Sequence, residues 1–357
     1  MSKQLRIWLF ILLGTLLAST SLLAEGVITM TTSKAVGEEI GLSIKANGNV
    51  TIEGAQDTGK TDSLDRKSYR LTSQTITIRG DVTGLACRYN QLTSLNVSKN
   101  TALTILVCSY NQLTSLDLSQ NTALTELFCH SNQLTSLDVS KNTALEVLDC
   151  LYNQLTDLDV SKNTTLTSLE CSYNQLTSLD LSQNTALTKL DCSWNQLTSL
   201  DVSKNTALTS FSCFDNQLTS LNVSKNRALT TLSCGGNQLT SLDLSKNTAL
   251  TELNCPDNQL TSLDVSKNTA LESLECSINQ LTSLNISGCA RLDALYCFSN
   301  CINGEAMTKL VNSLPNRKGM SSGSLWVVSR SSKKGDKNRC SVADVTTARK
   351  KNWEVQQ

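Results

Sequence analysis

The chain is poor in the residues on which most enzymes rely. It has a single histidine, His130, among its 357 residues. The motifs of a nucleophile elbow, a phosphate-binding loop and an HExxH metal site do not occur in it. A metal pair of His130 with its neighbour Cys129 is also excluded, because consecutive side chains on a strand point to opposite faces. We therefore expect no enzyme activity, no metal site and no cofactor.

A net charge of one sign is missing too. Lys and Arg together number 31, and so do Asp and Glu. The balance hides an uneven distribution, since residues 82–302 hold 19 acids against 11 bases and residues 303–357 hold 4 acids against 11 bases. The acidic character of the longer region argues against nucleic acid as a partner.

Long apolar runs are limited to one. It extends from Ile7 to Leu17, follows two basic residues and precedes small and polar residues up to Ala24. It is shorter than the roughly 20 residues that span a bilayer. This layout predicts a signal peptide over residues 1–24, and hence a secreted or cell-surface protein without a transmembrane segment after signal removal.

What the chain does contain is a repeat of 21 residues. One unit reads Leu124-Thr-Glu-Leu127-Phe-Cys129-His-Ser-Asn132-Gln-Leu134, which is an LxxLxCxxNxL pattern. The period predicts a leucine-rich-repeat solenoid over residues 82–302, with a parallel β-sheet on its concave face. The rest of each coil is rich in Thr, Ser, Val, Asp and Asn, which are poor helix formers, so we expect no α-helix on the convex side.

The repeated cysteines form a ladder of inward-facing residues: Cys87, Cys108, Cys129, Cys150, Cys171, Cys192, Cys213, Cys234, Cys255, Cys276 and Cys297. Neighbours in this ladder would lie ~4.8 Å apart with parallel side chains, a geometry that does not suit a disulfide. We expect buried thiols that act as apolar fillers and have a raised pKa. Cys289, Cys301 and Cys340 lie off the ladder and are the candidates for one disulfide, with the pairing left open.

The flanks of the repeat have other patterns. Residues 25–81 alternate like strands between glycines, which predicts a β-rich N-terminal cap. Residues 303–357 predict a small α/β C-terminal cap, with a helix over residues 305–314, a strand near Leu325 and a last helix that begins with a capping box at Ser341. We expect Trp326 and Trp353 in the core of this cap.

The NQLTSLDVSKNTALTxLxC unit resembles the cysteine-type leucine-rich repeats of bacterial internalins, in particular internalin-J-related surface proteins of Gram-negative anaerobes. The likeness covers residues 82–302, and the strand-like segment around Leu42-Ser-Ile-Lys is similar to the N-terminal cap of such proteins. It implies a surface or secreted protein used in host-cell attachment or biofilm formation, without naming a partner.

The positions that the repeat leaves variable are the candidate ligand-binding residues of the concave face. Aromatic residues stand two positions after the cysteine in the first coils, and Asp215, Gly236 and Asp257 stand there in later coils. A surface of this kind could hold a peptide, a glycan ring or a cationic group. The candidates are Tyr89, Tyr110, Phe128, His130, Tyr152, Tyr173, Trp194 and Phe214, with Asp149, Glu170 and Asp191 beside them.

Alternatives remain at this point. The aromatic residues could simply shield the corner after each strand, and the repeated convex aspartates, such as Asp138, favour turn capping over calcium binding. Our first hypothesis is an exported adhesion or recognition protein that binds protein or glycan on host or bacterial surfaces. The second is a structural spacer or self-associating scaffold without a dedicated ligand. A thiol-based metal or redox function is a weaker third.

Overall fold

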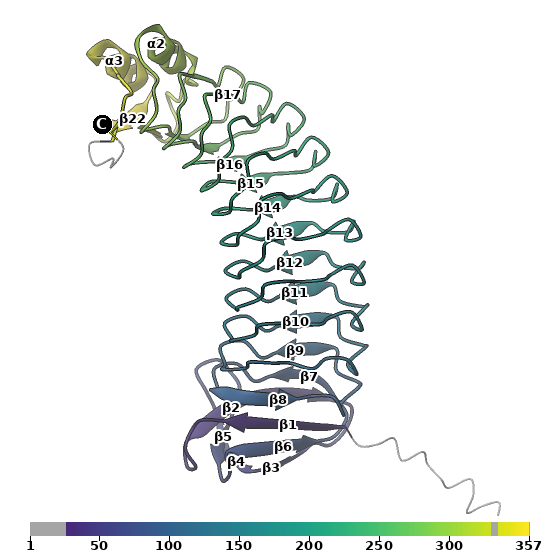
Figure 1. Cartoon of the computed structure of the whole chain (residues 1–357). Coiled ribbons are helices and arrows are strands. Elements are labelled where there is room, and N and C mark those ends of the chain that lie inside the picture. Colours follow the sequence, from purple (N-terminus) through teal and green to yellow (C-terminus); the bar gives the residue numbers. More distant parts are fainter. Residues whose placement is uncertain (1–25, 330–334, 357) are drawn as a thin grey trace, which may run out of the picture.

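The computed structural model describes residues 26–329 and 335–356, so the predicted signal peptide lies outside the described residues. The repeats stack into a curved solenoid with a cap at each end (Figure 1). Each coil adds one parallel strand in register, as Leu127 pairs with Leu106 on one side and Leu148 on the other. These strands are β9 (Ile105–Val107), β10 (Glu126–Phe128), β11 (Val147–Asp149), β12 (Ser168–Glu170), β13 (Lys189–Asp191), β14 (Ser210–Ser212), β15 (Thr231–Ser233), β16 (Glu252–Asn254), β18 (Ser273–Glu275) and β20 (Ala294–Tyr296).

The core of the solenoid is a column of leucines and ladder cysteines. Leu127 on β10 and Cys129, one residue beyond the end of that strand, are both completely buried, and so is every other ladder cysteine. The backbone N–H of Cys129 donates to the carbonyl of Asp149 at 2.8 Å, which extends the ladder of strand hydrogen bonds by one residue. The inward phase predicted for the cysteines is confirmed.

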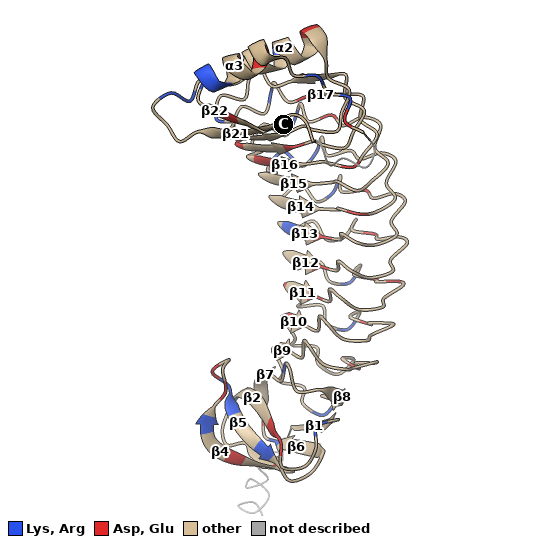
Figure 2. Ribbon diagram, turned by 90° about the vertical axis from the view of Figure 1, so that its left-hand side faces the viewer, with Lys and Arg blue, Asp and Glu red and all other residues tan. Residues whose placement is uncertain are grey.

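The convex side of each coil consists of turns. Asp138 accepts a hydrogen bond from the backbone N–H of Ser140 at 2.9 Å, and the same contact recurs at the other convex aspartates. Turn capping is thus the structural role of these residues. Residues 82–302, all of which are described, contain no helix, as predicted; the convex strands β17 (Ser262–Asp264) and β19 (Ser283–Asn285) form a short parallel pair. Figure 2 shows the strands along the inner edge of the arc and the turns along the outer edge.

A buried amide ladder follows the cysteines. The side-chain N–H groups of Asn153 donate to the carbonyls of Cys150 at 3.0 Å and of Cys129 in the preceding coil at 3.2 Å. Its carbonyl oxygen accepts the backbone N–H of Leu134 at 3.0 Å. One side chain therefore joins two coils and ends the strand at the same place in every repeat.

The N-terminal cap covers both open edges of the first coil. Strand β2 (Glu39–Ala46) pairs antiparallel with β7 (Val82–Ala86) and so continues the concave sheet, while β1 (Val27–Thr32) pairs antiparallel with β8 (Leu92–Asn96). Paired edges offer no free backbone groups to another chain. The other strands of the cap are β3 (Thr51–Glu53), β4 (Ala55–Thr61), β5 (Lys67–Leu71) and β6 (Thr75–Arg79).

The described residues of the C-terminal cap form two helices and two further strands. Helix α2 (Gly304–Ser313) and helix α3 (Val342–Lys350) match the two predicted helices, and Ser341 and Asp344 form the predicted capping box. Strand β21 (Gly323–Trp326) extends the concave sheet, and β22 (Trp353–Gln356), which the sequence pattern did not indicate, follows it. Trp353 is buried as expected, whereas Trp326 is only half-buried. Trp326 instead packs beside Phe298 on the sheet, with ring centroids 5.0 Å apart.

The disulfide predicted among the off-ladder cysteines is not formed between Cys289, Cys301 and Cys340, all of which are described. Cys289 occupies the slot of an asparagine in a second, convex-side amide ladder. Its thiol lies 3.3 Å from the carbonyl of Val265 and 3.7 Å from that of Asn268. The asparagine one coil earlier, Asn268, donates to the equivalent carbonyls of Leu244 and Asn247. Cys289 therefore substitutes for a ladder amide, and its thiol is buried.

Candidate functional site

The aromatic residues two positions after the cysteine lie on the surface, and the backbone explains why. Strict strand alternation would turn them inward, yet each has a left-handed conformation. This positive φ reverses the direction of the side chain just before the buried asparagine. Between 36% and 49% of each side chain is exposed. We call these five residues the aromatic track: Tyr89, Tyr110, Tyr152, Tyr173 and Trp194, with φ between 51° and 59°.

The rings of the aromatic track stack along the solenoid in two groups. Tyr89 and Tyr110 are parallel, with centroids 4.1 Å apart, and Ser131 in the next coil interrupts the track. Tyr152 and Tyr173 stack at 4.0 Å, and Trp194 stacks on Tyr173 at 5.2 Å. Phe214 then follows Trp194 at 6.0 Å with a tilt of 42°. Within each group, rings stacked at the coil spacing form an apolar strip.

His130 lies between the two groups and is more covered than expected of an outward residue. Its ring packs edge-on against Tyr110, with centroids 4.8 Å apart, and its Nε2 lies 3.8 Å from Oδ2 of Asp149. Burial lowers the pKa of His130. Burial also raises the pKa of Asp149 to about 6, and the charge of Glu170 adds to the effect. Other residues directly after the cysteine, such as Ser172 and Ser193, are buried rather than outward.

The remaining predicted acids lie on the strands beside the track. Glu170 forms an ion pair with Lys189 on the next strand, so its charge is partly balanced within the sheet. Asp191 accepts a hydrogen bond from the backbone N–H of Ser193 at 3.0 Å. Phe128 is half-buried on its strand. The structure thus brings the predicted concave residues together on one surface.

The structure adds Asp215, which the sequence did not place among the candidate binding residues. The pKa of Tyr173 is raised, first by its hydrogen bond with Tyr152, and the charges of Asp191 and Asp215 raise it further. Asp215 therefore lies within electrostatic reach of the track. The slot of Asp215 continues with Gly236 and Asp257, all at positive φ. Asp and Gly tolerate this conformation best, so their recurrence in one slot was a signal for the left-handed backbone.

The ladder thiols lie beneath this surface. Burial raises the pKa of Cys87 and of Cys234 to about 12, from an ordinary value of 9.0. Thiols are reactive as thiolates, so groups with such pKa values are inert at neutral pH. Among the described residues, no group of three His, Cys, Asp or Glu side chains could hold a metal ion.

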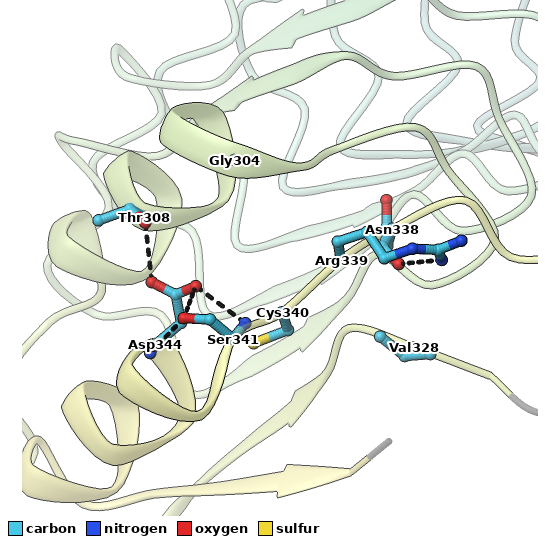
Figure 3. Close-up of a pocket in the computed structure, with 8 residues that line it drawn as sticks. All are labelled: Gly304, Thr308, Val328, Asn338, Arg339, Cys340, Ser341 and Asp344. Atoms are coloured by element: carbon cyan, nitrogen blue, oxygen red, sulfur yellow. Dashed lines mark hydrogen bonds between the residues drawn. The ribbon is translucent and has the colours of Figure 1, made fainter.

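A pocket in the C-terminal cap is the main alternative site (Figure 3). It has a volume of about 630 Å³ and lies between the start of α2 and the segment before α3. The carboxylate that lines this pocket belongs to Asp344. It already accepts hydrogen bonds from Ser341 at 2.7 Å and from Thr308 at 2.9 Å. These contacts cap α3 and tie it to α2, which is a structural role.

In the part of the chain that the structure describes, no helix has the length and apolar character needed to cross a bilayer.

Comparisons with known proteins agree with this architecture. No family model and no curated protein sequence matches the chain. The functional domain of InlJ from Listeria monocytogenes, which includes a cysteine ladder, is 30% identical; the match covers 80% of this chain and 75% of that chain, with a TM-score of 0.46. The internalin InlF from the same organism is 22% identical, with 76% and 86% covered and a TM-score of 0.59.

A plant protein has the same fold. The ectodomain of the membrane receptor kinase GASSHO1/SCHENGEN3 from Arabidopsis thaliana, solved in complex with CASPARIAN STRIP INTEGRITY FACTOR 2, is 20% identical to this chain. The match covers 72% of this chain and 36% of that chain, with a TM-score of 0.56. At this identity the likeness, like that to InlF, concerns the leucine-rich-repeat fold alone.

Proposed function

This chain belongs to the cysteine-ladder leucine-rich-repeat family that includes internalin J, and from that premise we propose that it is a non-enzymatic recognition protein. It binds a protein or glycan partner along the concave face, and the aromatic track is the centre of the binding surface. The plant ectodomain of the same fold, solved with a partner, supports a binding role. Large aromatic side chains dominate the energetics of many interfaces.

One observation carries this proposal. The aromatic track places tyrosine and tryptophan in a left-handed conformation, which disfavours residues with a Cβ by about 1 kcal/mol or more relative to glycine. Aspartate and glycine in later coils show that the fold accepts more suitable residues there. Ring stacking offsets part of the strain, by roughly 0.5–1.5 kcal/mol per pair. Folding alone therefore gives little reason to expose these rings, whereas a ligand does.

We further propose that the protein is exported and acts in adhesion, either in host-cell attachment or in biofilm formation. The support is the apolar segment over residues 7–17, with its signal-peptide layout, together with the internalin resemblance. Retention of the protein on intact cells, or its release into the medium, is measured by fractionation and immunoblotting. A protein confined to the cytoplasm would contradict export.

The binding proposal is tested by a triple change in three consecutive aromatic coils, Tyr152→Ala, Tyr173→Ala and Trp194→Ala. Capture of partners from host and bacterial surface fractions should fall at least thirtyfold, since truncation of an aromatic hot spot costs about 2 kcal/mol or more. The free energy of unfolding should fall by no more than about 3 kcal/mol, because the change removes the two stacked pairs that Tyr173 makes with its neighbours.

The matched control changes Thr156, Thr177 and Thr198 to Ala in the same three coils, at exposed positions away from the track. It should leave capture unchanged. Unfolding of the aromatic variant would assign the rings a packing role. Undiminished capture by a folded aromatic variant would instead favour the spacer function.

A further inference from the structure

The C-terminal end of the aromatic track has a composition of its own. After Trp194 and Phe214 the next coil carries Gly235 and Gly236. A Cβ added to Gly235 would lie 2.7 Å from the rings of both Phe214 and Pro256, so the absence of a side chain lets these two rings meet over the backbone. Trp194, Phe214 and Pro256 together make an apolar platform across consecutive coils.

Two carboxylates border this platform. Asp215 and Asp257 flank Gly236 in the slot of the aromatic track, and Gly236 places no side chain between them. Each carboxylate repels the other, and the repulsion shows in Asp215, whose pKa is raised by burial and by the charge of Asp257. None of the salt bridges between described residues involves Asp191 or Asp215, in contrast to Glu170 with its partner Lys189.

An aromatic face beside two mutually repelling carboxylates suits a cation better than a neutral group. Tyr173 stacks on one face of Trp194, and a guanidinium or ammonium group near the other face, toward the coil of Asp215, is attracted by the ring. The same group placed near Asp215 would relieve the repulsion between the two carboxylates, which hydroxyl groups of a neutral sugar cannot do. The exposed edges of the stacked rings of Tyr173 and Tyr152 continue from this point and can contact the backbone or apolar side chains of an extended segment.

We propose that the platform of Trp194, Phe214 and Pro256, bordered by Asp215 and Asp257, binds a lysine or arginine side chain of an extended protein segment that runs along the aromatic track. This assignment rests on the proposed function, since it names the chemistry of the partner at one end of the same surface. It also gives the surface a direction, because the cationic residue must lie toward the C-terminal coils.

The experiment uses the full chain with octaarginine, octalysine and the neutral sugar cellohexaose as probes, followed by calorimetry at low and at physiological salt. Asp215→Asn removes one carboxylate of the site. Asp243→Asn is the matched control, because it removes the same charge from a convex turn whose slot is occupied by an equivalent asparagine, Asn222, in another coil. Both variants should fold like the wild type.

We expect Asp215→Asn to weaken binding of the cationic peptides about tenfold, and Asp243→Asn to weaken it less than twofold. Equal losses in both variants would reveal attraction to the acidic solenoid as a whole and overturn the site. Tighter binding of cellohexaose than of either peptide would also overturn it in favour of a glycan. If the wild type sediments as a dimer and Asp215→Asn dissociates it, the cation comes from the basic C-terminal region of a second copy. That result would overturn binding of an external segment.

These outcomes are separable from failure of the proposed function. If the triple aromatic variant loses its surface partners while Asp215→Asn keeps them at full affinity, the concave face binds a ligand but not through a cation at this end. If neither variant loses partners, the proposed function itself fails.

Discussion

The N-terminal and C-terminal coils of the solenoid share one backbone but differ in the side chains at its most constrained position. Two residues after each ladder cysteine the chain adopts a left-handed conformation, with φ from 47° to 61°. The early coils place rings there, as at Tyr152. The later coils place Asp215, Gly236, Asp257, Ile278 and Ser299 there. Because the backbone is the same, its preferences cannot account for the difference.

The later coils come closer to what the backbone favours, since three of the five residues are Asp or Gly. The early coils place less favoured residues in this conformation, and the rings of these residues contact one another. Stacking repays part of the strain but leaves the rings exposed. The comparison therefore distinguishes residues that suit the left-handed backbone, in the later coils, from exposed aromatic residues that the backbone does not favour, in the early coils. The two halves should therefore be alike in the core beneath that surface and differ in the side chains on it.

The largest effect should come from the core that both halves share. The buried thiols have raised pKa values, so the unfolded chain loses thiol protons above pH 9 while the folded chain keeps them. Stability from this source is complete below the ordinary thiol pKa and is lost as the pH rises toward the folded values. Each buried thiol lowers the free energy of unfolding by about 1.4 kcal/mol per pH unit in this range.

For the whole ladder, the free energy of unfolding should fall by about 15 kcal/mol per pH unit. This slope is comparable with the entire stability of a typical domain. Guanidinium unfolding under reducing conditions between pH 8 and pH 10.5 measures it. Changing Cys108, Cys129 and Cys150 to Ala should reduce the slope by about 4 kcal/mol per pH unit, and changing Cys234, Cys255 and Cys276 should reduce it equally. An unchanged slope would contradict the burial of the ladder.

Single ladder changes should have smaller and equal effects in the two halves. Cys171→Ser and Cys276→Ser should each lower the free energy of unfolding by about 1–3 kcal/mol, because a buried hydroxyl needs a partner. Cys192→Ser is the control and should cost less, since the sulfur of Cys192 already lies 3.5 Å from the carbonyl of Ser212. Chemical denaturation checks all three. A large difference between Cys171→Ser and Cys276→Ser would mean that the halves do not share a core.

The acid beside the early aromatic coils should show an unusual pH dependence. The pKa of Asp149 is raised to about 6 by burial, so its contribution to stability is complete below the ordinary pKa and is lost as the pH rises through about 6. Asp149→Asn should therefore stabilise the protein at pH 7, on the order of 1–2 kcal/mol, and remove this dependence between pH 4 and pH 7.

The convex Asp138 should behave in the opposite way. Its hydrogen bonds with Ser140 lower its pKa, so the stability it contributes is lost as the pH falls through the folded value. Urea unfolding at pH 4, 5, 6 and 7 compares Asp149→Asn with Asp138→Asn. The same sign of pH dependence at the two sites would be incompatible with the burial of Asp149 on the concave face.

The smallest effect concerns the left-handed slot itself. Ile278 is β-branched and has a φ of 53°, an unfavourable combination. Ile278→Asn should stabilise the protein by up to about 1 kcal/mol, because asparagine accepts this conformation. Tyr152→Asn makes the same change in an early coil but loses the stack with Tyr173, so it should give no gain. Equal gains at both positions would show that stacking contributes little and that the two halves do not differ in this respect.

The repeating part of the fold was predictable because its signals are local and periodic. The 21-residue spacing, the inward phase of the cysteines and the lack of helix-forming residues in the rest of the coil specified the solenoid. The capping box at Ser341 did the same for the last helix. Each of these depends on residues within one or two turns of chain, where side-chain direction follows directly from the strand or helix period.

The candidate binding surface was only partly predictable. The sequence identified the aromatic residues and the acids beside them, but it did not include Asp215 among the candidates and did not indicate how far His130 is covered. It also missed the left-handed backbone, the half-exposed Trp326 and the role of Cys289 as a ladder amide. All of these depend on neighbours one or more coils away, about 21 residues apart in the chain and a strand spacing of ~4.8 Å apart in space.

The sequence by itself thus determined which residues recur and which face of the coil each occupies, because hydrophobic period and turn chemistry act over a few residues. Stacking decided what those residues meet. Stacking of the coils brought Tyr152, Tyr173 and Trp194 into one strip and placed Asp215 within electrostatic reach of Tyr173. It also buried the ladder thiols, and this burial raises their pKa values. Burial and charge depend on the whole column of coils, and no single repeat contains that column.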